Sequence, residues 1–471
     1  MQSLHSTIPR AGHRAFWLRE VAGDAPDAPR LIGDQRADVA IVGGGYVGLW
    51  TAIELKLRDR AVDVALLEAD ICGSGASGRN GGFAMTWWSK IALLVPFLGE
   101  QEALRLARAS VAGIDDIGEL LADHGADCDL RRGGWIWAAS HRSQLGAWES
   151  TLAACRRLGV APFEPLDAEQ VKRRAGSRVL VGGVFDRDTA RVQPAKLVRA
   201  LRRIAIALGV RVHEHSPMIA LDRSRPAQLA TPDGTLTVER VVLAHNVWAA
   251  GMPEFRRTIA AISSDMVVTE PIPDRLAAIG WTGEECISDS QMTVHYYRTT
   301  ADGRVAFGKG GGTVAFSGRV GAGFDRSRRR AEETARNFRR LCPALADVPI
   351  AEDWSGAIDR SVTGLPLIGR TGGLPHVFHA VGWSANAVGP ARVGAQFIAS
   401  LVLDADDEWR RSPLVDLPAQ RFPPEPIRFL GAKLVRAGVV RREHAELAGR
   451  RPDPLSRLLA AQAPSGMIPR A

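Results

Sequence analysis

Three glycines and one glutamate near the N-terminus have the types and spacing needed to bind a dinucleotide. Gly43, Gly45 and Gly48 form G-x-G-x-x-G after the apolar run DVAIV, and Glu68 follows twenty residues after Gly48. The first glycine permits a tight turn, the second lets the backbone approach a pyrophosphate, and the third allows close helix packing. The helix N-terminus then presents N–H groups to the phosphates. A carboxylate at position 68 can accept hydrogen bonds from ribose hydroxyls and repels a 2′-phosphate, which disfavours NADP.

A second glycine-rich stretch, GASGRNGG at residues 75–82, favours FAD over NAD. So many small residues are expected where backbone amides approach an extended, anionic ligand. Arg79 is a candidate for neutralising phosphate charge, and Ser77 and Asn80 for bonding phosphate or ribityl hydroxyls. The alternative is an ordinary loop with a surface arginine and a turn asparagine. The predicted contacts of this loop are Ser77, Gly78, Arg79, Asn80 and Gly81.

A third stretch, AVGWSANAVGPARVGAQFIASLVL at residues 380–403, reads as a strand, a small-residue turn and an apolar helix. If that helix N-terminus faces a flavin, its N–H groups stabilise the negative charge that develops at N1–C2=O on reduction. A plain strand–turn–helix without a ligand is the alternative. The predicted contacts here are Gly382, Ser384, Ala385 and Asn386.

The elements that must position these residues begin with a βαβ unit. The pattern predicts a strand over 38–42, a helix over 46–57 and a second strand over 62–68. Later apolar runs predict strands at 210–215, 240–244 and 377–381, with helices at 194–208 and 391–403. Three separated pieces therefore build one Rossmann-like, glutathione-reductase-type FAD-binding domain, at 1–95, 180–255 and 352–405.

The intervening residues have a different character and predict an inserted substrate domain, at 96–179 and 256–351. A long helix over 100–124, a strand within 129–140, and helices at 145–158 and 168–174 are expected in the first part. The second part predicts strands between 262 and 316, a hairpin turn at Asp302-Gly303, and a polar helix over 326–341. The fold class is therefore α/β plus α+β, with a mixed sheet in the inserted domain and a helical tail at 406–471.

Length and composition exclude several classes of protein. A chain of 471 residues predicts two or three domains, and its 46% hydrophobic and 24% charged residues are typical of a folded globular protein. No apolar run reaches the roughly 18–20 residues of a membrane helix, and the first residues lack the apolar stretch of a secretory signal. The five cysteines are scattered without a C-x-x-C pair, which favours a reducing compartment and argues against zinc. A cytoplasmic enzyme without a metal is expected.

The formal charge of +8 is concentrated in the C-terminal tail. Between Ile427 and Arg451, seven basic residues face only Glu443 and Glu446. Such a segment can contact anionic lipid or nucleic acid, or can be a solvated helix face packed on the body. The charge does not by itself define the main function: no nucleic-acid partner is expected, and peripheral membrane contact stays open.

Five stretches together resemble FAD-dependent oxidoreductases of the D-amino-acid oxidase superfamily, and within it the gamma-glutamylputrescine oxidoreductase-like branch. They are DVAIVGGGYVGLWTAIEL, GASGRNGGF, DxxxVQPAKLVRAL, YYR…DGRVAFG and GLPLIGR…GWSANAVGPA, spread over about residues 16–403. The resemblance implies a two-domain fold that oxidises a C–N bond of an amine or amino acid to an imine, which then hydrolyses. Hydride passes to flavin N5, and electrons pass on to O₂ or another acceptor.

The chain departs from this family pattern at two points. In relatives that oxidise glycine or D-amino acids, an arginine upstream of GLPxIG binds the substrate carboxylate, and here that register falls on Ile358, two residues before Arg360. Some relatives attach flavin through His or Cys, but GASGRNGGF contains neither, and Cys72 is the nearest thiol. Non-covalent FAD is therefore expected.

The substrate amine must be neutral to release hydride, which favours an uncharged, partly aromatic cage over a strong base. Tyr297 is the leading candidate because it lies in the YYR strand; Lys309 is a candidate for assisting O₂ reduction, and Arg360 or Asp359 for binding a charged end of the substrate. The alternative for Tyr297 is core packing, and the alternative for Lys309 is a position on the surface. For Arg360 or Asp359 the alternative is a structural ion pair. Further aromatic candidates are Tyr296, Trp87, Trp88 and Trp354, and His295 is expected to be a core residue.

Two other classes of function remain as alternatives. An NAD(P)H-dependent flavin reductase or monooxygenase would need a second nucleotide-binding βαβ unit or a redox cysteine pair, and the sequence has neither. An RNA- or membrane-associated flavoprotein is supported only by the basic tail.

Overall fold

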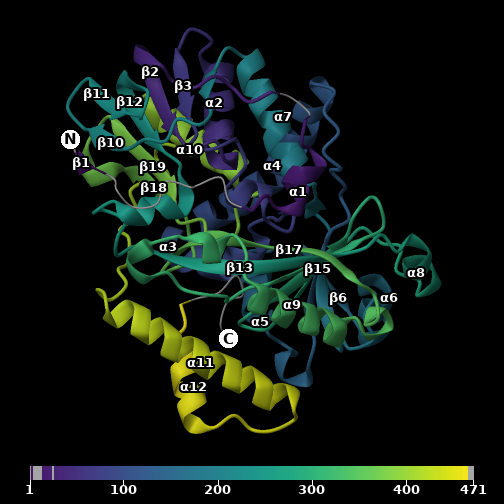
Figure 1. Ribbon diagram of the computed structural model, residues 1–471. Helices are drawn as coiled ribbons and strands as arrows, with labels where there is room; N and C mark the ends of the chain where they lie inside the picture. Colours follow the sequence, from purple (N-terminus) through teal and green to yellow (C-terminus); the bar gives the residue numbers. More distant parts are fainter. Residues whose placement is uncertain (1, 4–12, 24–25, 465–471) are drawn as a thin grey trace.

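Two large β-sheets organise the chain in the computed structural model, which describes residues 2–3, 13–23 and 26–464. A nine-stranded sheet forms one half of the molecule and an eight-stranded sheet the other, with a helical hairpin beyond the second sheet (Figure 1). A separate two-stranded ribbon, β4 (Phe83–Ala84) with β8 (Ala190–Arg191), joins segments far apart in sequence.

The nine-stranded sheet contains the predicted βαβ unit. Parallel strands β9, β3, β2, β12 and β19 lie in that order, and β18 joins the edge antiparallel to β19. The central pairing residues, 39–42 of β2, 64–67 of β3 and 241–243 of β12, are apolar and buried, as expected for a parallel sheet covered on both faces. The bounds are β1 Gln2–Ser3, β2 Gly33–Val42, β3 Val64–Leu67, β9 Arg211–His213, β10 Ala220–Asp222, β11 Ala227–Ala230, β12 Gly234–Leu243, β18 Leu367–Arg370 and β19 Val377–Val381.

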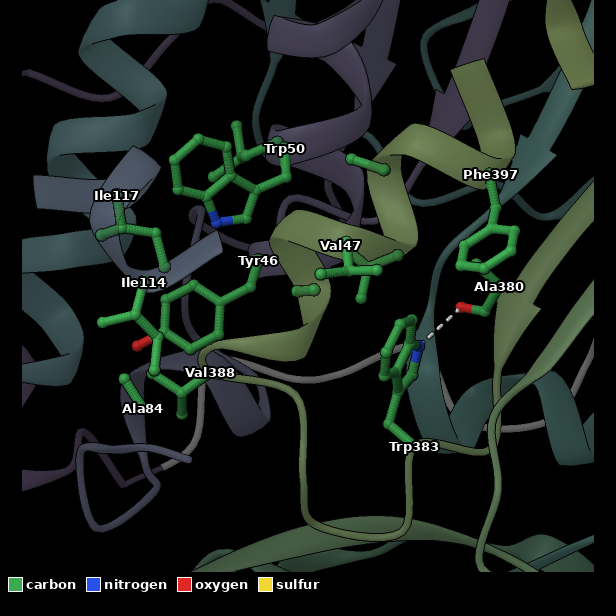
Figure 2. Packing of buried hydrophobic residues seen from close by; sticks show 14 of the residues in the cluster. Tyr46, Val47, Trp50, Ala84, Ile114, Ile117, Ala380, Trp383, Val388 and Phe397 are labelled. Carbon is green, nitrogen blue, oxygen red and sulfur yellow. Dashed lines mark hydrogen bonds between the residues drawn. The ribbon is translucent and has the colours of Figure 1, made fainter. Parts of the chain in front are cut away.

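Helices α2 and α10 pack against each other and against helix α4 to form the main core. Figure 2 shows Tyr46 and Trp50 of α2 beside Ile114 and Ile117 of α4, with Val47 on the side of Trp383 and of Phe397 of α10. Helices α2 and α10 each follow a strand of the first sheet, so their packing fixes the loops that precede them. The helix bounds of this half are α1 Phe16–Glu20, α2 Tyr46–Arg58, α3 Ile91–Leu98, α4 Glu100–Asp123, α7 Pro194–Ala207 and α10 Pro390–Val402.

The eight-stranded mixed sheet has the order β17-β13-β16-β15-β14-β5-β7-β6. The predicted hairpin at Asp302-Gly303 is confirmed, because β15 and β16 pair antiparallel around a turn in which Gly303 has φ of +77°. The strand bounds are β5 Trp135–Ala139, β6 Phe163–Leu166, β7 Gly182–Asp186, β13 Ile259–Thr269, β14 Cys286–Asp289, β15 His295–Thr299, β16 Val305–Lys309 and β17 Ile350–Ser361. The helices are α5 Glu149–Arg157, α6 Ala168–Ala175, α8 Pro273–Ala278 and α9 Arg328–Leu341.

Three elements lie on the other side of an expected domain boundary in this arrangement. Strand β7 lies in the segment 180–255, which was expected to belong to the FAD-binding domain. It pairs instead with β5 and β6 in the eight-stranded sheet. Strand β17, assigned in part to the first domain from residue 352, pairs along nearly its whole length with β13. Helix α4, assigned to the inserted domain, packs in the main core with α10. Apolar patterning identified the elements, but only long-range pairing decides which sheet each strand joins.

The C-terminal tail folds into a hairpin of α11 (Ile427–Leu447) and α12 (Pro454–Ala461), drawn in yellow in Figure 1. The two helices cross at Gly438, where an added Cβ would lie 2.4 Å from Leu459 Cβ. Among the described residues, no helix is long and apolar enough to cross a membrane.

Candidate FAD and substrate site

One cavity of about 1130 Å³ runs from the ends of the parallel strands, past the second sheet, to helix α11. Its walls include most of the residues predicted from the three glycine-rich stretches. Those that line it are Gly43, Gly45, Glu68, Ser77, Arg79, Asn80, Gly81, Ser384 and Ala385, together with Arg360. The three stretches therefore meet at one trough, although they are more than 300 residues apart at the extremes.

The glycines of the first motif act as their spacing predicts. Gly43 has φ of +113°, and an added Cβ would lie 2.6 Å from Ala244 O. A Cβ on Gly48 would lie 1.9 Å from Gly43 O, so Gly48 does not line the cavity but lets α2 approach the turn. Gly45 does line it and is the N-cap residue of α2, with an added Cβ 2.9 Å from Ser77 Oγ.

Glu68 lies at the end of β3 with both carboxylate oxygens already oriented. Its Oε2 accepts the N–H of Gly44 at 2.7 Å, and its Oε1 accepts the N–H of Asp70 at 2.9 Å. Burial raises the pKa of Glu68 to about 7, although both N–H bonds lower it. Each carboxylate oxygen has a second lone pair, so the group retains capacity to accept from a ribose hydroxyl in the cavity.

Substituting Glu68 by alanine is expected to weaken FAD binding by roughly 10- to 150-fold, the loss of one charge-assisted bond of about 1.5–3 kcal/mol. Titration of the apoprotein with FAD, followed by flavin fluorescence, measures this. Since the ionised carboxylate is the better acceptor, the affinity of the unsubstituted protein should also fall as the pH drops through about 7. Glu68→Gln should lose that pH dependence, while the exposed control Glu239→Ala should change neither property. Unaltered affinity in Glu68→Ala would contradict the assignment.

The second glycine-rich loop is held by its own polar side chains. Ser77 Oγ accepts the N–H of Tyr46 at 2.9 Å, which ties the loop to the start of α2. Asn80 donates to Ala76 O and Ser77 O and accepts from Gly82 N, so its side chain shapes the turn. Arg79 donates to the carbonyls of Ser74, Ser355 and His13. The polar groups of Asn80 and Arg79 are thus engaged within the protein, and Gly78 lies behind the wall; their contact with FAD stays a prediction.

Asp359 of β17 holds the loop of the third glycine-rich stretch, at residues 382–386, through two backbone N–H groups. Its Oδ2 accepts the N–H of Gly382 at 2.6 Å, and its backbone carbonyl accepts from Ser384 N at 3.2 Å. Burial raises the pKa of Asp359 to about 7, and its Oδ2 holds the N–H of this loop, which gives Asp359 a positioning role. Asp359 also lines the cavity, so its contact with a charged end of the substrate stays a prediction. Ser384 and Ala385 have φ of 55° and 69°, a left-handed conformation unusual for residues with a Cβ. Gly382 and Asn386 support this loop without lining the cavity.

Arg360 is a cation that faces the cavity without a counterion. Among the described residues, no side-chain hydrogen bond or ion pair to its guanidinium is found, and burial lowers its pKa to about 10. A second cation, Lys90, is buried behind the wall and donates to Gly364 O at 2.6 Å. Burial and the charge of Arg360 lower the pKa of Lys90 to about 7. The positive charge at this end of the cavity therefore favours an anionic group of a ligand.

The expectation for Tyr297 is not met by its position. Tyr297 is 1% exposed, stacks on Phe307 in the core of the second domain, and donates to Ala175 O at 3.1 Å. Its neighbour Tyr296 lines the cavity, with its hydroxyl 2.8 Å from Ser264 Oγ. Successive residues of a strand point to opposite faces, so the side chain on the cavity side is one residue earlier.

Lys309 also lies away from the cavity wall. Its Nζ forms an ion pair with Glu333 Oε1 of α9 at 3.2 Å, and the side chain is 9% exposed. Lys309 is therefore a buried, structural ion-pair residue and not a surface lysine. His295 is buried against Asp289, with Nδ1 2.8 Å from Oδ2, as expected for a core histidine.

The core-packing alternative holds for the three candidate tryptophans, and two other tryptophans line the cavity. Trp87, Trp88 and Trp354 are buried in the cores and do not line the cavity, whereas Trp248 and Trp383 do. Trp248 and His245 follow directly after β12, at the same sheet edge as Gly43 and Glu68. The carboxyl ends of parallel strands are where ligands usually bind, so the position of His245 and Trp248 after a predicted strand was a signal for them in the sequence.

Cys72, the thiol nearest to the second glycine-rich loop in the sequence, is buried, which raises its pKa well above the usual value.

These residues fit FAD on structural grounds. His245 Nδ1 and Trp248 Nε1 are buried at the cavity wall without a hydrogen-bond partner among the described residues. An added Cβ at Gly45 or Gly81 would meet the opposite wall at about 3 Å, so the backbone itself forms the cradle. An elongated, polar ligand fills such a trough and satisfies these donors.

Comparison with known proteins agrees with this interpretation. The sequence matches the family described as FAD dependent oxidoreductase over residues 38–401. It is 29% identical over 389 residues to gamma-glutamylputrescine oxidoreductase of Escherichia coli, covering 82% of this chain and 88% of that one. It is 28% identical over 389 residues to probable oxidoreductase OrdL of Haemophilus influenzae, covering 81% and 86%.

Solved structures share the fold. Glycine oxidase from Geobacillus kaustophilus superposes with a TM-score of 0.68 at 23% identity, covering 82% of this chain and 99% of that chain. L-proline dehydrogenase from P. horikoshii gives 0.64 at 18% identity, covering 81% and 98%. These neighbours confirm the predicted α/β FAD-binding fold with an inserted domain. Because the family match extends over most of the chain, this protein belongs to the FAD dependent oxidoreductase family.

Proposed function

We propose that the protein oxidises the C–N bond of an amine or amino acid to an imine, which water then hydrolyses. Three features support this: the family match, relatives whose names include gamma-glutamylputrescine oxidoreductase and glycine oxidase, and the continuous cavity. The cavity carries the most weight, because the FAD cradle opens directly onto a region lined by Arg360, Tyr296 and Trp383. FAD, when bound, supplies the hydride acceptor, and O₂ or another acceptor takes the electrons onward.

The chain's own residues account for binding and orientation of the substrate. Arg360 would bind an anionic end, since its charge has no counterion among the described residues. The aromatic rings of Tyr296 and Trp383 favour the neutral form of the amine, because desolvation lowers the pKa of an ammonium group. No strong base is needed at the reacting carbon once the amine is neutral. Substrate positioning is then the main contribution of the protein.

Anaerobic mixing of the purified protein with a panel of amines and amino acids is expected to bleach the oxidised-flavin absorbance with at least one member. The panel should contain primary and secondary amines, α-amino acids and amides of diamines, each with a carboxylate-free analogue. NADPH is the matched alternative donor and is expected to leave the spectrum unchanged. If NADPH bleaches the flavin and the whole panel does not, a reductase or monooxygenase function replaces this one.

A further inference from the structure

The outward face of the C-terminal hairpin is apolar and exposed. Leu430 and Leu434 recur at helical spacing on α11 and are 55% and 59% exposed, and Ile427 at the start of the helix is 60% exposed although it also borders the cavity. Leu455 and Leu458 of α12 are 56% and 61% exposed. The described part of the chain exposes eleven large apolar side chains, and five of them lie on these two helices. Such a concentration indicates an interaction surface.

The inward face of α11 is firmly attached, so the hairpin is not a loosely placed tail. Arg436 donates to Gly311 O at 2.6 Å, and Arg428 donates to Arg256 O at 2.6 Å. Glu443, buried in the cavity wall, accepts from Thr293 N at 2.9 Å and Thr293 Oγ1 at 2.6 Å. With its inward side fixed to the second domain, α11 holds Leu430 and Leu434 pointing away from the body.

The charge of the hairpin favours an anionic partner. Residues 427–464 contain eight basic and three acidic residues. All three carboxylates are engaged: Glu443 with Thr293, Glu446 with Arg442 at 2.7 Å, and Asp453 with the first turn of α12. Five basic side chains remain exposed and form no ion pair with another described residue. They are Lys433, Arg441, Arg450, Arg451 and Arg457.

We propose that this hairpin docks the enzyme on an anionic lipid surface, with Leu430, Leu434, Leu455 and Leu458 inserted at the headgroup boundary. Leucine flanked by Lys and Arg is the pattern of helices that lie in a membrane interface without crossing it. A bilayer accommodates separated leucines on two helices and attracts all five cations, whereas a second copy of this chain would bring the same positive charges together. The opposite face of α11 lines the cavity, so docking would turn that end of the cavity toward the membrane.

Co-sedimentation of the FAD-loaded protein with vesicles tests the proposal without any turnover. Vesicles of phosphatidylcholine with about one third phosphatidylglycerol should carry the protein down, and phosphatidylcholine alone should carry down much less. The variant Leu430→Ser/Leu434→Ser/Leu458→Ser should weaken binding by at least about tenfold. Lys433→Gln/Arg441→Gln should weaken it several-fold on anionic vesicles, as should raised salt.

A matched control removes exposed apolar side chains elsewhere. Ile32, Leu57 and Ile206 are 70%, 52% and 43% exposed and lie outside the hairpin, so Ile32→Ser/Leu57→Ser/Ile206→Ser should bind as the unsubstituted protein does. Retained flavin absorbance shows that each variant is folded. Absence of binding to anionic vesicles overturns the proposal, as does equal binding by the hairpin variant. Sedimentation velocity showing a dimer that the hairpin variant dissociates, without vesicle binding, would assign the surface to a second copy instead.

Discussion

Replacing Arg360 by leucine is expected to raise the KM for an amino-acid substrate by roughly 10²- to 4 × 10³-fold. A substrate carboxylate would lose its counterion inside the cavity, a loss of about 3–5 kcal/mol for a buried ion pair broken on one side. The KM of an amine without a carboxylate should change little, because it makes no such contact. Steady-state kinetics on a matched pair, one amino acid and its decarboxylated amine, measure the difference.

The pKa of Lys90 provides a second readout of the Arg360→Leu substitution. The charge of Arg360 contributes to the lowered pKa of Lys90, about 7, so removing it should raise that pKa. Arg360→Lys should bind the amino acid more tightly than Arg360→Leu but less tightly than the unsubstituted protein. Lysine keeps the positive charge but lacks the planar guanidinium, which binds a carboxylate through two N–H groups. Arg411→Leu, an exposed arginine paired with Asp406, is the control and should leave the KM unchanged. If Arg360→Leu raises the KM of the amino acid and the amine equally, the carboxylate role is wrong.

The dinucleotide half of the site follows closely from the sequence because its determinants are local. The turn at Gly43, the cap of α2 and the acidic end of β3 all lie within one βαβ unit, whose geometry depends on a few consecutive residues. The DG turn between β15 and β16 was predictable for the same reason. The spacing of these glycines is therefore enough to predict the turn, and Gly43 and Gly45 line the cavity.

The substrate half was less predictable because it depends on which face of a strand meets the cavity. Tyr296 and Tyr297 differ only in strand phase, and which face of β15 meets the cavity depends on how the whole eight-stranded sheet packs against the rest of the molecule. Lys309 was placed near the cofactor by its glycine-rich surroundings, yet Glu333 on α9 holds it in an ion pair. The wall formed by α11 had no local signal, because its inward residues resemble those of any packed helix. Contacts such as Lys309 with Glu333 and Thr293 with Glu443 join residues more than 20 apart, which residue patterns along the chain do not predict.

Replacing Gly48 by alanine is expected to abolish stable FAD binding and to lower the melting temperature. A Cβ there would lie 1.9 Å from the carbonyl oxygen of Gly43, a backbone atom that can move only if the turn itself opens. Overpacking of this kind costs about 1–3 kcal/mol or more, and here the strain falls on the turn that is predicted to contact the cofactor. Thermal unfolding and the ratio of flavin to protein absorbance after purification measure the two effects.

Gly118→Ala is the matched control, because it adds the same methyl group to a helix in the same half of the molecule. Its Cβ would lie 3.5 Å from Leu130 Cδ2, an ordinary contact, and alanine is favoured over glycine within a helix by about 0.5–1 kcal/mol. The control should therefore keep its FAD and unfold at the same or a slightly higher temperature. A Gly48→Ala protein that retains full flavin content would mean that α2 can shift without disturbing the turn. In that case the close approach of α2 to Gly43 would not be what shapes the cofactor cradle.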